Sequence, residues 1–159
     1  MPSLEQKLSD HFLLKELCYT SHRTIDNTPP DEVVTRLRLL SWKVLEPIRE
    51  EFGAVRVNSG YRCPELNKKI GGAKDSAHLY GVAADIDLIS NDRKLQEVVN
   101  WVLDSELDFD QIILESSSTA NWIHIGSLRP DHEKVPRRQA LRFKNGTYTV
   151  YDRKTNYGV

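Results

Sequence analysis

Two short segments that are far apart in the chain share one pattern, and this pattern limits the folds that the chain can adopt. Val82–Leu88 reads as a β-strand in which Asp85 alternates with apolar neighbours. Asn121–Gly126 reads as a second strand in which His124 stands between two isoleucines. Each strand therefore shows a metal-ligating side chain on one face and apolar residues on the other. We expect both strands in one sheet, with a covered apolar face and an open face.

A third residue of ligand type, His78, lies in the loop that enters the first strand. Imidazole and carboxylate groups are ligands that Zn²⁺ accepts, and three protein ligands leave a fourth tetrahedral position for water. We therefore interpret His78, Asp85 and His124 as the ligands of one zinc ion with an open, catalytic position. The small residues Gly81 and Ala83 are expected to leave room for a substrate beside this ion.

Four short motifs contain or adjoin these residues: Ser59-Gly60-Tyr61-Arg62, Gly71-Gly72-Ala73, Ser76-x-His78-x-x-Gly81-x-Ala83-x-Asp85 and Trp122-x-His124. Together they closely resemble the zinc D-alanyl-D-alanine carboxypeptidase family, which includes peptidoglycan-cleaving carboxypeptidases, the D-Ala-D-Ala dipeptidases of vancomycin resistance and phage endolysins. That family shares its metal site with the lysostaphin-type peptidases and the hedgehog signalling domain. The resemblance covers roughly residues 8 to 127, and the combination of motifs is specific.

The resemblance implies a role for individual residues of these motifs. It implies zinc at the three ligands named above, with Arg62 over the site to polarise the scissile carbonyl and to hold the oxyanion. Ser76 would hydrogen-bond the substrate or orient His78. Tyr61 would line the substrate cleft.

One position departs from the family pattern, and it concerns the general base. Many carboxypeptidases and endolysins of this family carry an acidic residue three positions before the last histidine, whereas this chain carries Asn121 there. An amide cannot take a proton from water, so another carboxylate is needed. The run that ends at Glu115 reads as a strand that pairs antiparallel with the His124 strand, and it is similar to the hedgehog domain here. Glu115 is therefore the predicted base, with Asp110 and Asp87 as alternatives.

The remaining pattern favours a single α+β domain over residues 1–159. A chain of 159 residues with 39% hydrophobic content can bury one core. We expect a small antiparallel sheet that bears the zinc site on its open face, with helices packed on the other face, as in hedgehog and D,D-peptidase domains. A helical arm would occupy residues 1–30, and the Asn145-Gly146 turn signal predicts a hairpin over about residues 139–151.

Three helices are expected from apolar periodicity and end signals. The longest runs from Asp31 to Phe52 and should kink or split near Val44, because Pro47 removes one backbone donor. A second runs from Asn91 to Leu107, and a short one lies in the arm. The predicted caps of these two helices are Asn91 or Asp92 and Ser9 or Asp10.

Composition and charge argue against several classes of function. The formal net charge of −1 gives no general attraction to nucleic acid, and the locally basic segment from Lys134 to Arg142 reads as a solvated face. No apolar run approaches the length of a membrane span, and the first residues lack the order of a signal peptide, so synthesis in the cytoplasm is expected. Cys18 and Cys63 are expected to be free thiols. His11 and His22 lack partners at ligand spacing and are expected as surface or packing residues.

These features predict a zinc-dependent peptidase that acts on peptidoglycan peptides. The resemblance implies a terminal D-Ala-D-Ala bond or a cross-link that involves a D-residue, and it leaves exo and endo cleavage open. A phage lysis enzyme, a bacterial wall-remodelling enzyme and a cleavage module of a phage particle all agree with it, each reaching the wall after lysis or export. The alternative is a zinc-stabilised domain that binds wall peptide or a protein partner without cutting it, which Asn121 favours. A monomer is expected.

Overall fold

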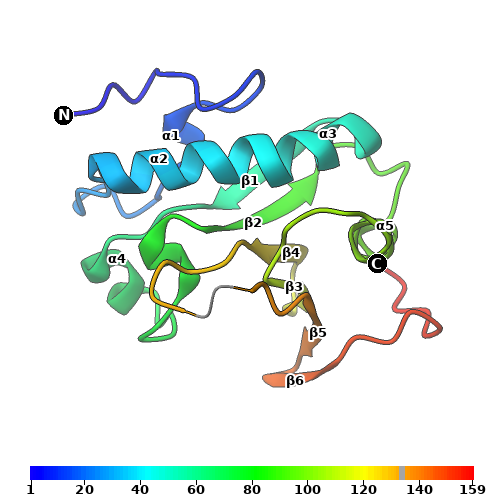
Figure 1. The fold of residues 1–159 in the computed structure, drawn as a ribbon. Helices are drawn as coiled ribbons and strands as arrows, with labels where there is room; N and C mark the ends of the chain where they lie inside the picture. Colours follow the sequence, from blue (N-terminus) through cyan, green and yellow to red (C-terminus); the bar gives the residue numbers. More distant parts are fainter. Residues whose placement is uncertain (133–134) are drawn as a thin grey trace.

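A six-stranded sheet with the strand order β1-β2-β4-β3-β5-β6 forms the centre of the fold (Figure 1). A computed structural model describes residues 1–132 and 135–159. The outer strands β1 and β6 each pair with one neighbour, and the ligand-bearing strands β2 and β4 pair with each other. The strands are β1 (Val55–Ser59), β2 (Ala83–Leu88), β3 (Gln111–Ser116), β4 (Asn121–Gly126), β5 (Gln139–Lys144) and β6 (Thr147–Val150).

Helices cover one face of this sheet. The long helix crosses β1 and β2, and α5 packs on β3 and β4 (Figure 1). The helical elements are α1 (Leu14–Leu17), α2 (Asp31–Leu40), η1 (Ser41–Leu45), α3 (Glu46–Phe52), α4 (Pro64–Lys69), η2 (Ala77–Tyr80) and α5 (Leu95–Asp104). Six sheet residues that face the helices are at most 1% exposed, and they are Ala84, Ile86, Ile112, Leu114, Ile123 and Ile125. The expected α+β architecture, with helices on one face and an open face opposite, is confirmed.

The sheet is mixed, whereas a wholly antiparallel sheet was expected. β3 and β5 run parallel, with Gln111 beside Gln139, and the other neighbouring pairs are antiparallel. The reason lies in where β4 ends. Gly126 lies beside Gln111, at the start of β3. A strand that begins near this end and adds to the free edge of β3 must run in the same direction as β3. The hairpin β5–β6 is as predicted, since Asn145 and Gly146 both have positive φ, as a type I′ turn requires.

The long helix from Asp31 to Phe52 is continuous but contains one wide turn. Its middle, η1, is π-helical, and the backbone N–H of Glu46 donates to the carbonyl oxygen of Ser41. Pro47 follows directly and has no N–H to continue an α-helical bond pattern. The wide turn includes Val44, so the disturbance lies where the proline predicted it.

The other helix starts differ from the predicted caps. α1 begins only at Leu14, because Ser9 is used elsewhere and donates to Glu46 at 2.7 Å. α5 begins at Leu95, with Lys94 as its cap residue, and the Glu97 carboxylate accepts from the Lys94 backbone N–H at 2.7 Å. Asn91 and Asp92 belong to the preceding turn, in which Ser90 donates to Asp92.

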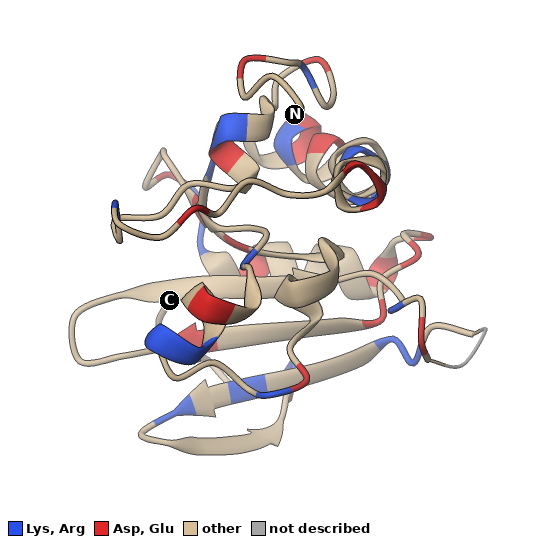
Figure 2. Ribbon diagram, turned by 90° about the vertical axis from the view of Figure 1, so that its left-hand side faces the viewer, with Lys and Arg blue, Asp and Glu red and all other residues tan. Residues whose placement is uncertain are grey.

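The basic segment from Lys134 to Arg142 was expected to be a solvated face, but two of its arginines make specific contacts within the fold. Arg142 is 5% exposed and donates to the carbonyl oxygen of Leu114 and to the hydroxyl of Ser116. Arg137 pairs with Asp110 at 2.7 Å. Lys134, at the start of the segment, lies outside the described residues. Figure 2 shows basic and acidic residues interspersed over the ribbon.

Two further sequence expectations concern the thiols and the membrane. Cys18 and Cys63 are both free. Within residues 1–132 and 135–159, no helix combines the length and the apolar character that crossing a bilayer would need.

Candidate active site

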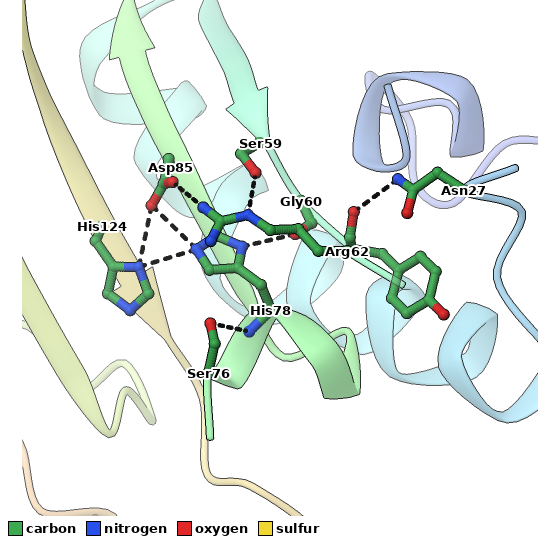
Figure 3. A network of polar contacts seen from close by, with 9 residues as sticks. Asn27, Ser59, Gly60, Arg62, Ser76, His78, Asp85 and His124 are labelled. Carbon is green, nitrogen blue, oxygen red and sulfur yellow. Dashed lines mark hydrogen bonds and ion pairs between the residues drawn. The ribbon is translucent and has the colours of Figure 1, made fainter. Parts of the chain in front are cut away.

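Three side chains from three elements meet on the open face of the sheet (Figure 3). His78 comes from η2, and Asp85 and His124 lie directly opposite each other on β2 and β4. His78 Nε2 is 3.2 Å from His124 Nδ1 and 3.2 Å from Asp85 Oδ1, and His124 Nδ1 is 3.0 Å from the same carboxylate oxygen. The predicted ligand set is therefore brought together as one group.

The geometry and the chemistry of this triangle suit one metal ion. Ligands at about 2.0–2.1 Å from a tetrahedral ion lie roughly 3.3 Å from one another, close to the edges of this triangle. The Nδ1 atom of His78 is 2.6 Å from the Gly60 carbonyl oxygen, so Nδ1 carries the proton of the neutral ring and Nε2 presents its lone pair. Two imidazole nitrogens and one carboxylate oxygen point at the same place, and few protons lie between them to make hydrogen bonds. A cation at this place would satisfy all three acceptors.

Burial and charge keep the group in the form that binds metal. His78 is 2% exposed, and burial lowers the pKa of His78 although the neighbouring Asp85 opposes this shift. Burial alone would raise the pKa of Asp85, but its contacts with His78 and His124 outweigh this and hold the pKa of Asp85 below its usual range. A neutral imidazole and an ionised carboxylate are the states that coordinate metal.

The loop from Ser59 to Cys63 orients Asp85 and His78 through hydrogen bonds. Arg62 donates to Asp85 Oδ2 at 2.9 Å, which leaves Oδ1 directed at the two imidazoles, and it donates to the Ser59 hydroxyl at 2.9 Å. The resemblance implied that Arg62 lies over the site and contacts the oxyanion. In the structure Arg62 lines the cleft and its charge is paired with the Asp85 carboxylate (Figure 3).

Asn27 holds this loop in place, and sequence reasoning did not single it out. Its side-chain amide donates to the carbonyl oxygens of Cys18 and Tyr61, each at 2.9 Å, and its side-chain oxygen accepts from the Cys63 N–H at 2.8 Å. Both neighbours of Arg62 are thereby fixed by one buried side chain. In the sequence Asn27 stands before Thr-Pro-Pro and is indistinguishable from an ordinary turn residue.

Ser76 and Gly81 shape the turn that carries His78. The Ser76 hydroxyl accepts from the His78 N–H at 3.3 Å, which agrees with the orienting role among the two that the resemblance implied. Gly81 has φ of +71°, and a side chain there would come within 2.6 Å of Val33. Gly81 is needed for packing against α2, so the expectation that it leaves room for substrate was wrong.

Glu115 lies in the same cleft as the three ligands, as the sequence predicted. The cleft has a volume of about 370 Å³ and is lined by Glu115, Arg62 and Ser76 as well as by the ligands. On β3 Glu115 is paired with Trp122, two positions from His124 on the same face. Burial raises the pKa of Glu115, and the negative charge of Asp85 adds to this effect.

Asn121 points away from the ligands. Odd and even positions of β4 face opposite sides of the sheet, so Asn121 lies on the face opposite His124, where it contacts the Ser116 side chain. On a regular strand, an acidic residue at position 121 would not reach the metal group. The register of β3 and β4 thus favours Glu115 as the acidic group of this site.

The other carboxylates and Tyr61 take different positions. Asp110 lines the cleft but is bound by Arg137, which donates to both of its oxygens. Asp87 lies outside this cleft, in a separate hollow beside Asn121. Tyr61 is 6% exposed and belongs to the hydrophobic core, so it does not line the cleft as the resemblance implied.

Two residues that sequence reasoning missed also line the cleft. Arg129 donates to Asp75 at 3.0 Å and to Asp131 at 2.8 Å, and it lies over the Tyr80 ring. It thereby ties the segment after β4 to the loop before Ser76. Tyr148, on β6, lines the same cleft. No sequence motif marked either residue.

Comparison with known proteins adds one positive finding. Residues 10–126 match the family model described as Peptidase M15, which covers most of the chain and includes all three ligands and Glu115. No curated protein matched the chain in a sequence search.

Proposed function

Since the chain belongs to the peptidase M15 family, we propose that it is a zinc-dependent peptidase that hydrolyses peptidoglycan stem or cross-link peptides. The observation that carries the proposal is the convergence of two imidazoles and a carboxylate within 3.2 Å of one another, in a cleft that also contains Glu115. An acidic residue in the same cleft as an open metal position is the arrangement that metal-assisted hydrolysis of a peptide bond uses.

His78, Asp85 and His124 would hold the ion. A bound zinc ion would polarise the scissile carbonyl and make water more acidic. Arg62 keeps the Asp85 carboxylate turned toward the two imidazoles through its 2.9 Å contact with Oδ2. Its positive charge, in the wall of the cleft, also favours the negative charge that develops on the carbonyl oxygen during attack.

Glu115 is the proposed proton carrier. It would take a proton from the attacking water and then deliver a proton to the nitrogen of the leaving amine. The raised pKa of this partly buried carboxyl, caused chiefly by burial, suits a group that must both accept and release a proton. Asp110 is less suited, because Arg137 lowers its pKa and occupies both oxygens.

The test is release of new amino groups from purified peptidoglycan by the zinc-loaded protein. A chelated sample and the Glu115→Gln variant run beside it, with Glu50→Gln, an exposed glutamate on α3, as the matched control. We expect cleavage that chelation abolishes, that Glu115→Gln reduces by roughly 10²-fold or more, and that Glu50→Gln leaves unchanged. Mass analysis of the fragments would identify the bond and distinguish exo from endo cleavage. Full activity of Glu115→Gln would show that another carboxylate is the general base.

A second function would apply if Glu115 did not act as the base, because the amide of Asn121 cannot take that role. The domain would then bind wall peptide or a protein partner around a structural zinc ion without cutting it. Stoichiometric zinc with no amine release from peptidoglycans of several chemotypes would support this alternative. In either case action at the cell wall, after lysis or export, is part of the proposal.

A further inference from the structure

The C-terminal hairpin lies beyond the residues that match the family model, yet it contributes to the cleft. Residues 10–126 carry the match, whereas β5 and β6 begin at Gln139 and Thr147. Tyr148 of β6 nevertheless lines the same cleft as the three ligands and Glu115. This chain therefore adds a wall to the site that the family resemblance did not predict.

The strand register places Tyr148 in a row with the predicted base. Trp122 pairs with Glu115 across β4 and β3, Glu115 with Phe143 across β3 and β5, and Phe143 with Tyr148 across β5 and β6. Residues that pair directly across strands share one face. The row therefore runs across the open face. It lies two residues along the strands from the row that contains Asp85 and His124.

The Tyr148 ring has the features of a contact surface. It packs on Phe143 with a centroid distance of 4.5 Å, which fixes its position, and yet it remains 57% exposed. Among the described residues, its hydroxyl has no protein hydrogen-bond partner. Burial raises the pKa of Tyr148, and the nearby charges of Glu115 and Asp85 add to this, so the hydroxyl stays a donor. An exposed ring that is held in place and carries a hydrogen-bond donor can contact a bound peptide chain.

The distance across the sheet sets which part of a substrate would reach this ring. His124 and Tyr148 lie on strands that are three spacings apart, which is about 14 Å at about 4.8 Å per strand. An extended peptide advances roughly 3.3 Å per residue, and the tyrosine side chain reaches part of the way back. The contact therefore falls two or more residues from the bond at the metal.

We propose that Tyr148 is a substrate-binding residue that selects for peptides extending at least two residues beyond the scissile bond, over β5 and β6. The ring packs against the substrate chain, and the hydroxyl donates to one of its carbonyl oxygens. The proposal rests on the proposed function, and it names the substrate class as longer stem or cross-linked peptides rather than free dipeptides.

The experiment compares two substrates with three variants of the zinc-loaded protein. The substrates are a synthetic stem pentapeptide ending in D-Ala-D-Ala and the acetylated D-Ala-D-Ala dipeptide. The variants are Tyr148→Ala, Tyr148→Phe and Thr149→Ala, the last being the exposed neighbour on the opposite face of β6. For the pentapeptide we expect kcat/KM to fall roughly 10- to 50-fold in Tyr148→Ala and roughly 3- to 10-fold in Tyr148→Phe. For the dipeptide all variants should stay within about twofold of the wild type.

Two outcomes would overturn the proposal: pentapeptide cleavage by Tyr148→Ala within about twofold of the wild type, or an equal loss on both substrates. If the wild type cleaves neither substrate, amine release from purified peptidoglycan shows whether the peptidase function itself has failed. The role of Tyr148 is then tested by calorimetric binding of the pentapeptide to the zinc-loaded Glu115→Gln protein. Binding that Tyr148→Ala weakens by roughly fivefold or more supports the contact. Equal binding, or none, contradicts it.

Discussion

The Nδ1 atom of His78 lies 2.6 Å from the carbonyl oxygen of Gly60, and the His78 carbonyl oxygen in turn accepts from the N–H of Arg62 at 3.1 Å. The loop that carries Arg62 and the turn that carries His78 are thus joined at two points. One contact sets which imidazole nitrogen faces the metal group, and the other holds the arginine that orients Asp85. Ligand geometry in this site therefore depends on the backbone of residues 59–63 as much as on the ligands.

Gly60→Ala should disturb this contact directly. A side chain at position 60 would lie 2.2 Å from the carbonyl oxygen of Leu17, which is backbone and cannot yield easily. We expect a stability loss of about 1–3 kcal/mol and a loss of zinc affinity of roughly 10- to 100-fold, measured by urea denaturation and by competition with a chelating dye. Gly53→Ala is the control, because it strains a positive φ in open space outside the site. It should cost stability without changing zinc affinity, and equal effects on affinity would contradict the explanation.

Asn27→Ala should disturb the same loop, residues 59–63, because Asn27 binds Tyr61 and Cys63. The change removes the buried donor for two carbonyl oxygens and the acceptor for the partly buried Cys63 N–H. We expect a loss of about 2–4 kcal/mol in the free energy of unfolding and roughly tenfold weaker zinc binding. The visible spectrum of the cobalt-substituted protein, recorded well below the unfolding temperature, should change as the ligands shift. Asn58→Ala, at an exposed position of β1, should leave both readouts unchanged, and an unaltered spectrum in Asn27→Ala would separate Asn27 from the metal group.

The sequence was sufficient to predict that His78, Asp85 and His124 form one group, because their signal is local. Along β2 and β4, Asp85 and His124 alternate with apolar residues. When the two strands pair, both polar side chains lie on one face, and the helices cover the apolar face opposite. Glu115 could be predicted for the same reason, from a strand next to the one that carries His124. The wide turn in the long helix follows from the chemistry of Pro47 alone.

Contacts between distant segments could not be predicted in this way. Asn27 and Arg129 act on loops that are far away in the sequence, and an asparagine or arginine in a loop has many ordinary uses. Tyr61 follows Gly60 in a site motif, yet the backbone bond from its N–H to the Leu17 carbonyl anchors it beside α1 and its ring enters the core. Tyr148 reaches the cleft only because β5 adds parallel to β3, a pairing that strand patterns do not specify.

Removing the metal should lower stability through the three ligands. A ligand that binds only the folded state stabilises it by about 2.7 kcal/mol at one hundred times its dissociation constant. We expect the unfolding temperature of the zinc-loaded protein to fall by several degrees on chelation and to recover when zinc is restored. His78→Ala should abolish this response and bind less than stoichiometric zinc. His22→Ala, outside the metal group, should behave as the wild type. A chelation response that survives in His78→Ala would place the stabilising ion elsewhere.

Glu115→Gln gives a pH-dependent test in the chelated protein. Burial, helped by the charge of Asp85, raises the folded-state pKa of Glu115 above its ordinary value of 4.5. A carboxyl with a raised folded-state pKa binds protons more readily when folded, so its ionised form costs stability at pH values above both the unfolded and the folded pKa. The cost disappears as the pH falls below the unfolded value. Replacing Glu115 by glutamine should therefore raise the unfolding temperature relative to the wild type at pH 7.

The same difference in unfolding temperature should shrink toward zero at pH 4 and should be smaller at pH 7 when zinc is present, because a cation beside Glu115 favours its ionised form. Glu50→Gln serves as the control and should show no comparable pH dependence, since Glu50 lies exposed on α3. A Glu115→Gln difference that is the same at pH 4 and pH 7, with and without zinc, would mean that Glu115 does not share the environment of the metal ligands.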